Sequence, residues 1–175
     1  TILNVGLNDK SVEGLIKQTN NPRFAWDAYR RLIQMFGKTV LDIDGAIFAR
    51  HLEKIKADNK LKSDTELSVE HLKSLVEIYK DVINSETGKD FPQDPRMQMD
   101  QAITAVFHSW NTDRAKLYRR RERIPDNLGT AVNIGTMVFG NMGDDSGTGV
   151  CFTRNPATGA PGHEIPSPTG ARPSQ

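Results

Sequence analysis

Glycine is concentrated in one stretch of this chain, and the residues on either side of it restrict what the C-terminal part can form. Four glycines lie between residues 140 and 149. Upstream, residues 130–139 alternate between two faces, and downstream, residues 148–153 are short, apolar and rich in β-branched side chains. Alternation with a period of two is typical of strands, and glycine is typical of the turn between them. The stretch therefore predicts a β-hairpin over residues 130–153 with a long tip.

The glycine-rich tip, residues 140–149, has more glycine than a turn requires. Successive glycines let backbone N–H groups converge into a nest that holds an anion such as phosphate, and the hydroxyls of Ser146 and Thr148 could add donors. Against this, the tip lacks the Lys-Ser/Thr ending of a P-loop, and Asp144 and Asp145 would repel phosphate unless a metal or basic partner intervened. The pattern alone leaves a plain hairpin turn and a phosphate cradle both open.

The chain before the hairpin reads as helical. Side chains that cap helix starts stand where apolar periodicity begins, and two of them precede a proline that fits the first helical position. The start signals are Asn21-Pro22, Asp44-Gly45, Ser68 and Asp94-Pro95, and Gly88 is an end signal. The expected helices cover about residues 10–18, 22–36, 45–55, 69–87, 95–110 and 114–123. Residues 1–7 are apolar and strand-like.

Four of the expected helices, those that begin near residues 22, 45, 69 and 95, carry apolar residues at helical spacing, which predicts a buried core. The helix over residues 69–87 has the cleanest amphipathic pattern, and the helix over residues 22–36 has two stripes and should be buried on a wide arc. In the helix that begins near residue 95, the spacing predicts a further buried stripe. Its members are Met99, Ile103, Val106, Phe107 and Trp110. Aromatic residues at this spacing are typical of a core rather than a ligand site.

The helix over residues 114–123 is the only dense positive cluster. Its arginines, Arg119, Arg120, Arg121 and Arg123 among them, could meet nucleic-acid phosphates. One helical turn of arginines without interleaved base-stacking aromatics more often forms a solvated face, or a surface that pairs with carboxylates of a neighbouring domain. The sequence therefore favours no nucleic-acid partner.

Composition sets the remaining limits. The 175 residues suffice for one domain with a core, and the formal net charge of +1 creates no field that would favour nucleic acid or an anionic membrane. The single Cys151 excludes an internal disulfide and is expected to be an inert thiol buried in a strand. The four histidines are scattered, so we expect neither a metal site nor a catalytic residue. A reducing, cytoplasmic compartment is the expectation, with no membrane association.

Several sequence blocks together resemble one enzyme family. The blocks are NPRFAWDAYRRLIQMF at 21–36, DFPQDP at 90–95, AVFHSW at 105–110, VFGNMGDDSGTGV at 138–150 and FTRNPATG at 152–159. In this order they closely resemble the nucleotide-binding part of the pyruvate, phosphate dikinase family, over about residues 1–159. The sibling phosphoenolpyruvate synthase family shares the hairpin more than the helical part.

The resemblance implies an ATP-grasp-like domain that uses ATP and magnesium to phosphorylate a histidine on a separate swivelling domain. A distant barrel domain then makes phosphoenolpyruvate from pyruvate, so that ATP, pyruvate and phosphate give AMP, phosphoenolpyruvate and pyrophosphate. The resemblance also implies a homodimeric parent enzyme. It places Met137, Val138 and Phe139 near the adenine, and Ser146, Gly147, Thr148 and Gly149 over the phosphates.

The resemblance also shows what this chain does not contain. The family's phosphate-binding lysine and arginine would precede residue 1, its acidic metal ligands would follow residue 159, and none of the four histidines has the phosphohistidine context. The chain departs from the family at Leu128, where tryptophan is usual, and at Gly135, where glutamine is usual.

We therefore expect an α+β chain that is an incomplete ATP-grasp-like nucleotide-binding domain. A mainly helical subdomain covers residues 1–124, the β-hairpin region covers 125–158, and a disordered Pro/Gly-rich tail covers 159–175. The expected function is that of an ATP-binding fragment of a dikinase, inactive alone. Its expected partners are ATP and the other dikinase domains, including the phosphohistidine domain. The alternative is a stand-alone interaction module that keeps the fold without catalysis.

Overall fold

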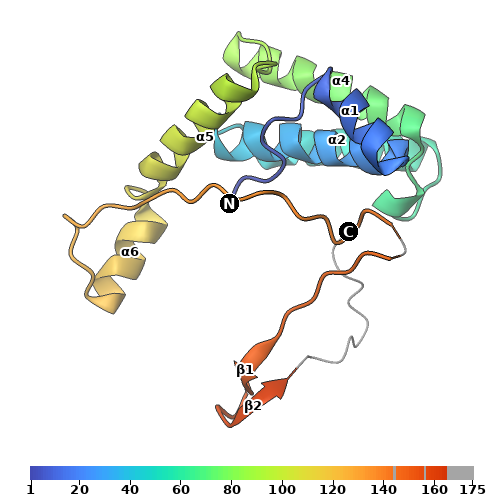
Figure 1. Ribbon diagram of the computed structural model, residues 1–175. Coiled ribbons are helices and arrows are strands. Elements are labelled where there is room, and N and C mark those ends of the chain that lie inside the picture. Colours follow the sequence, from blue (N-terminus) through green and yellow to red (C-terminus); the bar gives the residue numbers. More distant parts are fainter. Residues whose placement is uncertain (144, 156, 165–175) are drawn as a thin grey trace. The chain divides into compact units, whose positions relative to one another are not determined.

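The computed structural model describes residues 1–143, 145–155 and 157–164, and this part of the chain is mainly helical (Figure 1). Its elements are α1 (Ser11–Thr19), α2 (Pro22–Thr39), α3 (Gly45–Asp58), the 3₁₀ helix η1 (Asp64–Glu66), α4 (Val69–Thr87), α5 (Pro95–Ser109), α6 (Asp113–Glu122), β1 (Phe152–Arg154) and β2 (Pro161–Glu164). The chain forms two compact units, Thr1–Met137 and Val138–Gln175. The predicted boundaries at residues 124 and 158 stay a prediction, and most of the predicted tail lies outside the described residues.

The helices begin where the capping signals predicted. The side chains of Asn21, Asp44, Ser68 and Asp94 each accept a hydrogen bond from a backbone N–H two or three residues further on. These bonds satisfy N–H groups that the first helical turn leaves without a partner. At the other end of α4, Gly88 adopts a φ of 69°, the left-handed conformation that glycine tolerates best.

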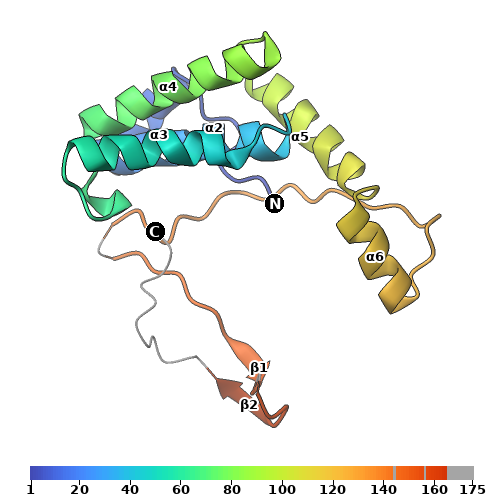
Figure 2. The same cartoon turned by 180° about the vertical axis from the view of Figure 1, so that it is seen from behind.

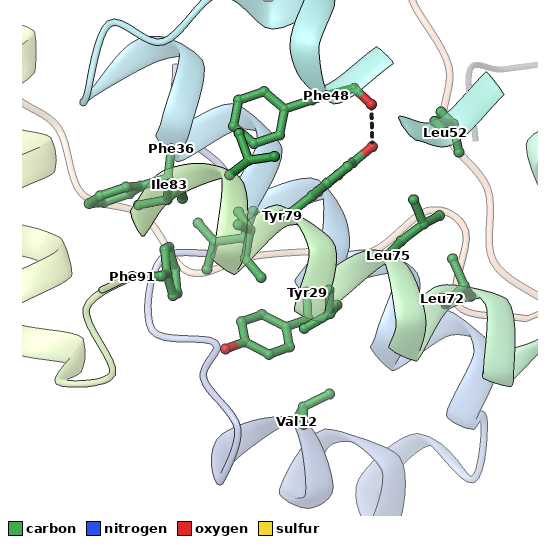
Figure 3. Close-up of a cluster of buried hydrophobic side chains, with 14 of the residues drawn as sticks. Val12, Tyr29, Phe36, Phe48, Leu52, Leu72, Leu75, Tyr79, Ile83 and Phe91 are labelled. Carbon is green, nitrogen blue, oxygen red and sulfur yellow. Dashed lines mark hydrogen bonds between the residues drawn. The ribbon is translucent and has the colours of Figure 1, made fainter. Parts of the chain in front are cut away.

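The core of the first unit forms where α2 packs against α4, with α1 packed on α2 and α3 packed on both α4 and α2 (Figure 1 and Figure 2). Figure 3 shows the ring of Phe48, from α3, edge-on to the ring of Tyr79, from α4. The two ring centroids are 5.0 Å apart, and the Tyr79 hydroxyl donates to the Phe48 carbonyl at 3.1 Å. The stripe predicted for α4 is buried throughout.

The wide buried arc predicted for α2 is confirmed, but it contains charges as well as apolar residues. Asp27 and Arg30 are only 5% and 3% exposed. The Asp27 carboxylate accepts from the Arg30 guanidinium and forms an ion pair with Arg31 at 2.8 Å. Burial of an ion is tolerated when its partner is close and hydrogen-bonded, and both conditions hold here.

The first seven residues form no strand, contrary to the prediction from their apolar pattern. Gln98 of α5, which is fully buried, holds them instead. Its Oε1 accepts from the Gly6 N–H at 2.8 Å, and its Nε2 donates to the carbonyls of Leu7 at 2.9 Å and Pro92 at 2.7 Å. An unpaired buried amide would cost about 1–3 kcal/mol, so Gln98 fixes this segment beside the start of α5.

The buried stripe predicted for α5 is wrong in part. The buried residues of α5 are Gln98 and Ala102, whereas Phe107 is 49% exposed. The C-terminal half of α5 extends beyond the α1–α4 bundle, so its apolar residues find few neighbours (Figure 1 and Figure 2).

The hairpin predicted over residues 130–153 is not formed in the described part of that range. Residues 130–143 and 145–151 contain no strand, and the antiparallel pair forms further along, between β1 and β2. Ile134 and Val138 are 69% and 88% exposed, and only Val132, Met137 and Phe139 of the alternating run are partly buried. An isolated strand pair is marginal in water, so an alternating pattern alone does not guarantee that a hairpin forms.

We predict opposite effects for the same substitution at two helical glycines. A Cβ at Gly37 in α2 would lie 2.5 Å from the buried Phe48 ring, whereas a Cβ at Gly14 in α1 would meet nothing within 4 Å. Gly37→Ala should lower the free energy of unfolding by about 1–3 kcal/mol through overpacking. Gly14→Ala should raise it by about 0.5–1 kcal/mol, because alanine is the better helix former. Urea unfolding measures both, and equal effects would contradict the assigned packing.

The second prediction concerns alkaline stability. Burial raises the pKa of Tyr79 from 10.0 to about 12, so the folded state keeps the hydroxyl neutral while the unfolded state ionises. The Tyr79 contribution is therefore fully present below pH 10 and is lost as the pH rises toward 12. The unfolding free energy of wild type should fall more steeply over this window than that of Tyr79→Phe, by about 1 kcal/mol per pH unit. Parallel curves for the two proteins would rule this out.

Candidate functional site

The segment that follows α6 and leads to the glycine-rich tip is held in place by contacts of Asp126 with Arg119 and Trp110. The Arg119 Nε donates to the Asp126 carboxylate at 2.7 Å, and its guanidinium lies 4.0 Å from the centre of the Trp110 ring. The Trp110 indole N–H in turn donates to the Asp126 carbonyl at 3.2 Å. We call Trp110, Arg119 and Asp126 the exit clamp, because together they fix where the chain leaves the helices.

The glycine-rich tip is a closed turn in the second unit. A Cβ added at Gly140 would overlap the Thr148 hydroxyl and would lie 2.8 Å from the Gly147 carbonyl oxygen. Within the turn, the Ser146 N–H donates to the Gly143 carbonyl at 3.0 Å. Only glycine at position 140 therefore allows the two limbs of the tip to approach this closely.

The structure brings some of the predicted phosphate-contacting residues together. Gly147 and Thr148 lie against Gly140, and Ser146 is half-buried at the turn. Gly149 is exposed, and no described atom lies within 4 Å of a Cβ placed there. Neither Gly147 nor Gly149 has a positive φ, so these glycines leave space beside the backbone rather than permit a left-handed turn.

The predicted adenine-contacting residues are only partly sheltered. Met137 and Phe139 are half-buried, and Val138 is 88% exposed. Met137 ends the first unit and Val138 begins the second.

The electrostatics of the tip are not those of a complete phosphate site. Residues 138–151 contain no lysine or arginine. The Asp145 carboxylate accepts from the Ser146 hydroxyl at 3.4 Å. Its negative charge would repel a phosphate bound at the tip. The Ser146 hydroxyl donates to Asp145 and the Ser146 N–H donates to Gly143, so the donors that remain at the tip are other backbone N–H groups and the Thr148 hydroxyl.

Other reactive side chains form no site within the described part of the chain. There, no three His, Cys, Asp or Glu side chains converge as metal ligands would. Cys151 is exposed and outside any strand, so the expectation of a buried strand thiol is wrong. Its exposure has the same cause as the missing hairpin, because the strand that should have covered it is not formed.

Sequence reasoning missed two features of this region. It did not separate Gly140 from the other glycines, although its place directly after the alternating run could have marked the closing position of a turn. It also missed an open groove of about 1030 Å³ between the end of α2 and α5. Cations and carboxylates are mixed along that groove, with Lys89 and Arg96 beside Asp42, Asp94 and Asp100, so no ligand class is selected.

Comparison with known proteins gives a consistent match. The family model described as "Pyruvate phosphate dikinase, AMP/ATP-binding domain" matches residues 1–165. The pyruvate, phosphate dikinase of Clostridium symbiosum is 49% identical over 166 residues, which is 93% of this chain and 19% of the relative. That of Giardia intestinalis is 52% identical over 159 residues, which is 91% of this chain and 18% of the relative.

A plant relative matches equally well. "Pyruvate, phosphate dikinase 1, chloroplastic" of Arabidopsis thaliana is 52% identical over 159 residues, which is 91% of this chain and 16% of the relative. The chain thus spans less than a fifth of the length of these curated relatives. In the described residues, no helix has the length and apolar character needed to cross a membrane.

The third prediction tests the closed turn. Gly140→Ala should separate the two limbs, because the added methyl group would overlap the Thr148 side chain. Nuclear Overhauser contacts between residue 140 and Thr148 should disappear. Gly147→Ala is the matched control, since its methyl group would enter open space and should leave these contacts in place. Contacts that persist in Gly140→Ala would show that the turn does not require glycine there.

Proposed function

The chain belongs to the family of the pyruvate phosphate dikinase AMP/ATP-binding domain, and from this we propose that it supplies one half of a dikinase ATP site. The other half would come from dikinase segments that this chain does not contain. We propose that residues 130–153 form the predicted hairpin once the rest of that domain gives them strands to pair with.

The closed turn at Gly140 is the observation that best supports this proposal. A Cβ at Gly140 would collide with Thr148 and the Gly147 carbonyl, so the two limbs of the tip lie close together and hold the backbone around residues 146–149 in a tight turn. The backbone N–H groups of such a turn suit the approach of a phosphate. A Cβ at Gly147 or Gly149 would meet nothing within 4 Å, so there is room for a phosphate beside this backbone. We assign Ser146, Gly147, Thr148 and Gly149 to the phosphates and Met137, Val138 and Phe139 to the adenine.

The described residues fit a nucleotide's phosphates better than they fit magnesium. Backbone and hydroxyl donors are present at the tip, but no set of three metal-ligand side chains converges among the described residues. Phosphoryl transfer depends on cations that neutralise charge as it develops. We therefore propose that the basic groups and the magnesium ligands come from other parts of a dikinase, and that this chain alone is inactive.

The proposed role of this chain's own residues is to bind and orient. The tip donors would hold the phosphates, and the exit clamp would fix the segment that enters the hairpin. When bound, magnesium would supply charge neutralisation. The further partners that we propose are those of the family, namely the phosphohistidine domain, the barrel domain that makes phosphoenolpyruvate, and a second subunit. A reducing compartment suits a single cysteine, and we propose the cytoplasm for this chain.

One observation favours the second candidate, a stand-alone interaction module. The tip has no cation and carries Asp145, so its charge opposes phosphate unless another segment compensates. Under this reading the helical bundle would be kept for contacts with a protein partner, and the tip would bind no nucleotide.

The fourth prediction separates the two candidates. In a ¹H–¹⁵N titration with Mg-ATP, the proposed half-site should bind with an affinity no better than about millimolar, near 4 kcal/mol, because the distant cations are absent. Shifts should concentrate at residues 146–149. Gly147→Val with Gly149→Val should abolish them, since the new side chains would fill the open space beside the backbone.

Two controls make the titration decisive. Gly14→Ala, far from the tip in sequence, should bind like wild type. Circular dichroism should show the double variant as helical as wild type. Absence of shifts at the tip, or shifts unchanged in the double variant, would reject the phosphate cradle in favour of the interaction module. Phosphoenolpyruvate-dependent ATP formation by the chain alone would refute the expected inactivity.

A further inference from the structure

Helix α6 has its sides reversed relative to an ordinary surface helix. Its one buried residue is Arg119, at 4% exposure, whereas its two large apolar residues, Leu117 and Tyr118, are 69% and 60% exposed. A surface helix normally buries the apolar side chains and leaves arginine in water. Contacts with Trp110 and Asp126 explain the burial of Arg119, but within the described residues nothing covers Leu117 and Tyr118.

The exposed residues form a regular stripe. Arg114, Leu117, Tyr118 and Arg121 stand at positions i, i+3, i+4 and i+7, which lie on one face of a helix. Arg119 is rotated by roughly 150° from the centre of this face at about 100° per residue. We call these four residues the α6 stripe.

The stripe is exposed on a helix that is firmly held. Arg119 donates to the Trp110 carbonyl and to Asp126, and it stacks on the Trp110 ring at 4.0 Å. These contacts fix one side of α6 against the end of α5, so the opposite side faces outward. In both views α6 lies at the end of α5, away from the α1–α4 bundle (Figure 1 and Figure 2).

The charges of the stripe define what can cover it. Within the described residues Arg114 forms no ion pair, and Arg121 meets only the neighbouring Glu122, at 3.6 Å with both side chains largely exposed. The two arginines flank the apolar pair at a separation of about 10 Å along the helix axis. A complementary surface needs an apolar patch between carboxylates.

We propose that the α6 stripe docks onto an acidic, partly apolar surface of the dikinase chain that lies outside the matched residues. The matched segment is 19% or less of each of three dikinase relatives. The rest of a dikinase chain is therefore the partner to which we assign the surface that covers the α6 stripe. The proposal rests on the proposed function in one respect, namely that the missing partner is dikinase chain. Nucleic acid is disfavoured because the centre of the stripe is apolar and its cations are few.

The experiment compares the chain alone with a chimera. In the chimera, the matched segment of the Clostridium symbiosum dikinase is replaced by this chain's matched residues. Both carry Cys151→Ser and one of three new cysteines: Leu117→Cys, Tyr118→Cys or Lys116→Cys. Lys116 is exposed on α6 but lies off the stripe, so it is the matched control. Maleimide labelling, read by peptide mass spectrometry, reports the exposure of each position.

All three cysteines should react readily in the chain alone. In the chimera, labelling at 117 and 118 should slow by about tenfold or more, while labelling at 116 should not change, because thiol modification depends on access. Equal reactivity at all three positions in the chimera would overturn the proposal, and so would protection at 116 as strong as at 117.

A charge-reversal pair tests the acidic character of the partner. Arg114→Glu with Arg121→Glu should lower the melting temperature of the chimera more than Lys116→Glu with Arg120→Glu, which changes the charge equally on the other side of α6. Equal decreases in melting temperature for the two variants would show that the partner surface is not acidic and would overturn the proposal. Binding of the chain to a fluorescent oligonucleotide at physiological salt, lost in the first variant alone, would assign the stripe to nucleic acid and overturn the proposal.

The outcome is separable from that of the proposed function. If 117 and 118 are protected in a chimera that binds no Mg-ATP, docking stands while the ATP half-site fails. If the chimera binds Mg-ATP with 117 and 118 still reactive, the half-site stands and the docking proposal fails.

Discussion

The burial of α2 is the constraint on which the first unit depends. This helix contacts α1, α3 and α4, and its buried residues extend around most of its circumference. Each large apolar side chain that it removes from water contributes about 1.5–3 kcal/mol. The helices α1, α3 and α4 each need only one apolar side, because that side packs against α2. The close fit of Gly37 against Phe48 shows how little space remains between α2 and α3.

Burying a helix on so many sides brings polar groups into the core, and these groups set the positions of the flanking segments. Asp27 and Arg30 must pair with each other, since a lone buried charge would cost several kcal/mol. Tyr29 donates to Asp9 at 2.9 Å and accepts from Gln93 at 3.1 Å, which links the segment before α1 to the one before α5. Burial raises the pKa of Tyr29, so these bonds persist in alkali.

The sequence predicted the features that local contacts decide, and it failed where a distant partner decides. Asn21 and Ser68 cap their helices through neighbouring N–H groups, so a short pattern suffices to find them. The apolar pattern of α5 that includes Phe107 indicates that the helix has one apolar side. The pattern cannot show whether another element covers that side, and Phe107 is exposed. The hairpin failed for the same reason. At the candidate site the pattern located the tip, and only the structure distinguished Gly140, whose role depends on the opposite limb.

The exposed apolar side chains connect the proposed docking of α6 with the proposed binding of nucleotide. The α1–α4 bundle closes its core with its own residues, whereas most large exposed apolar side chains in the described residues lie from Phe107 onward, Leu117, Ile134 and Val138 among them. A partner surface that covers these residues would also order the segment that leads to the tip. Ordering a loop before the ligand arrives removes part of the entropy that binding would otherwise have to overcome. The remainder of a dikinase domain would thus raise nucleotide affinity both through its cations and by holding the tip in place.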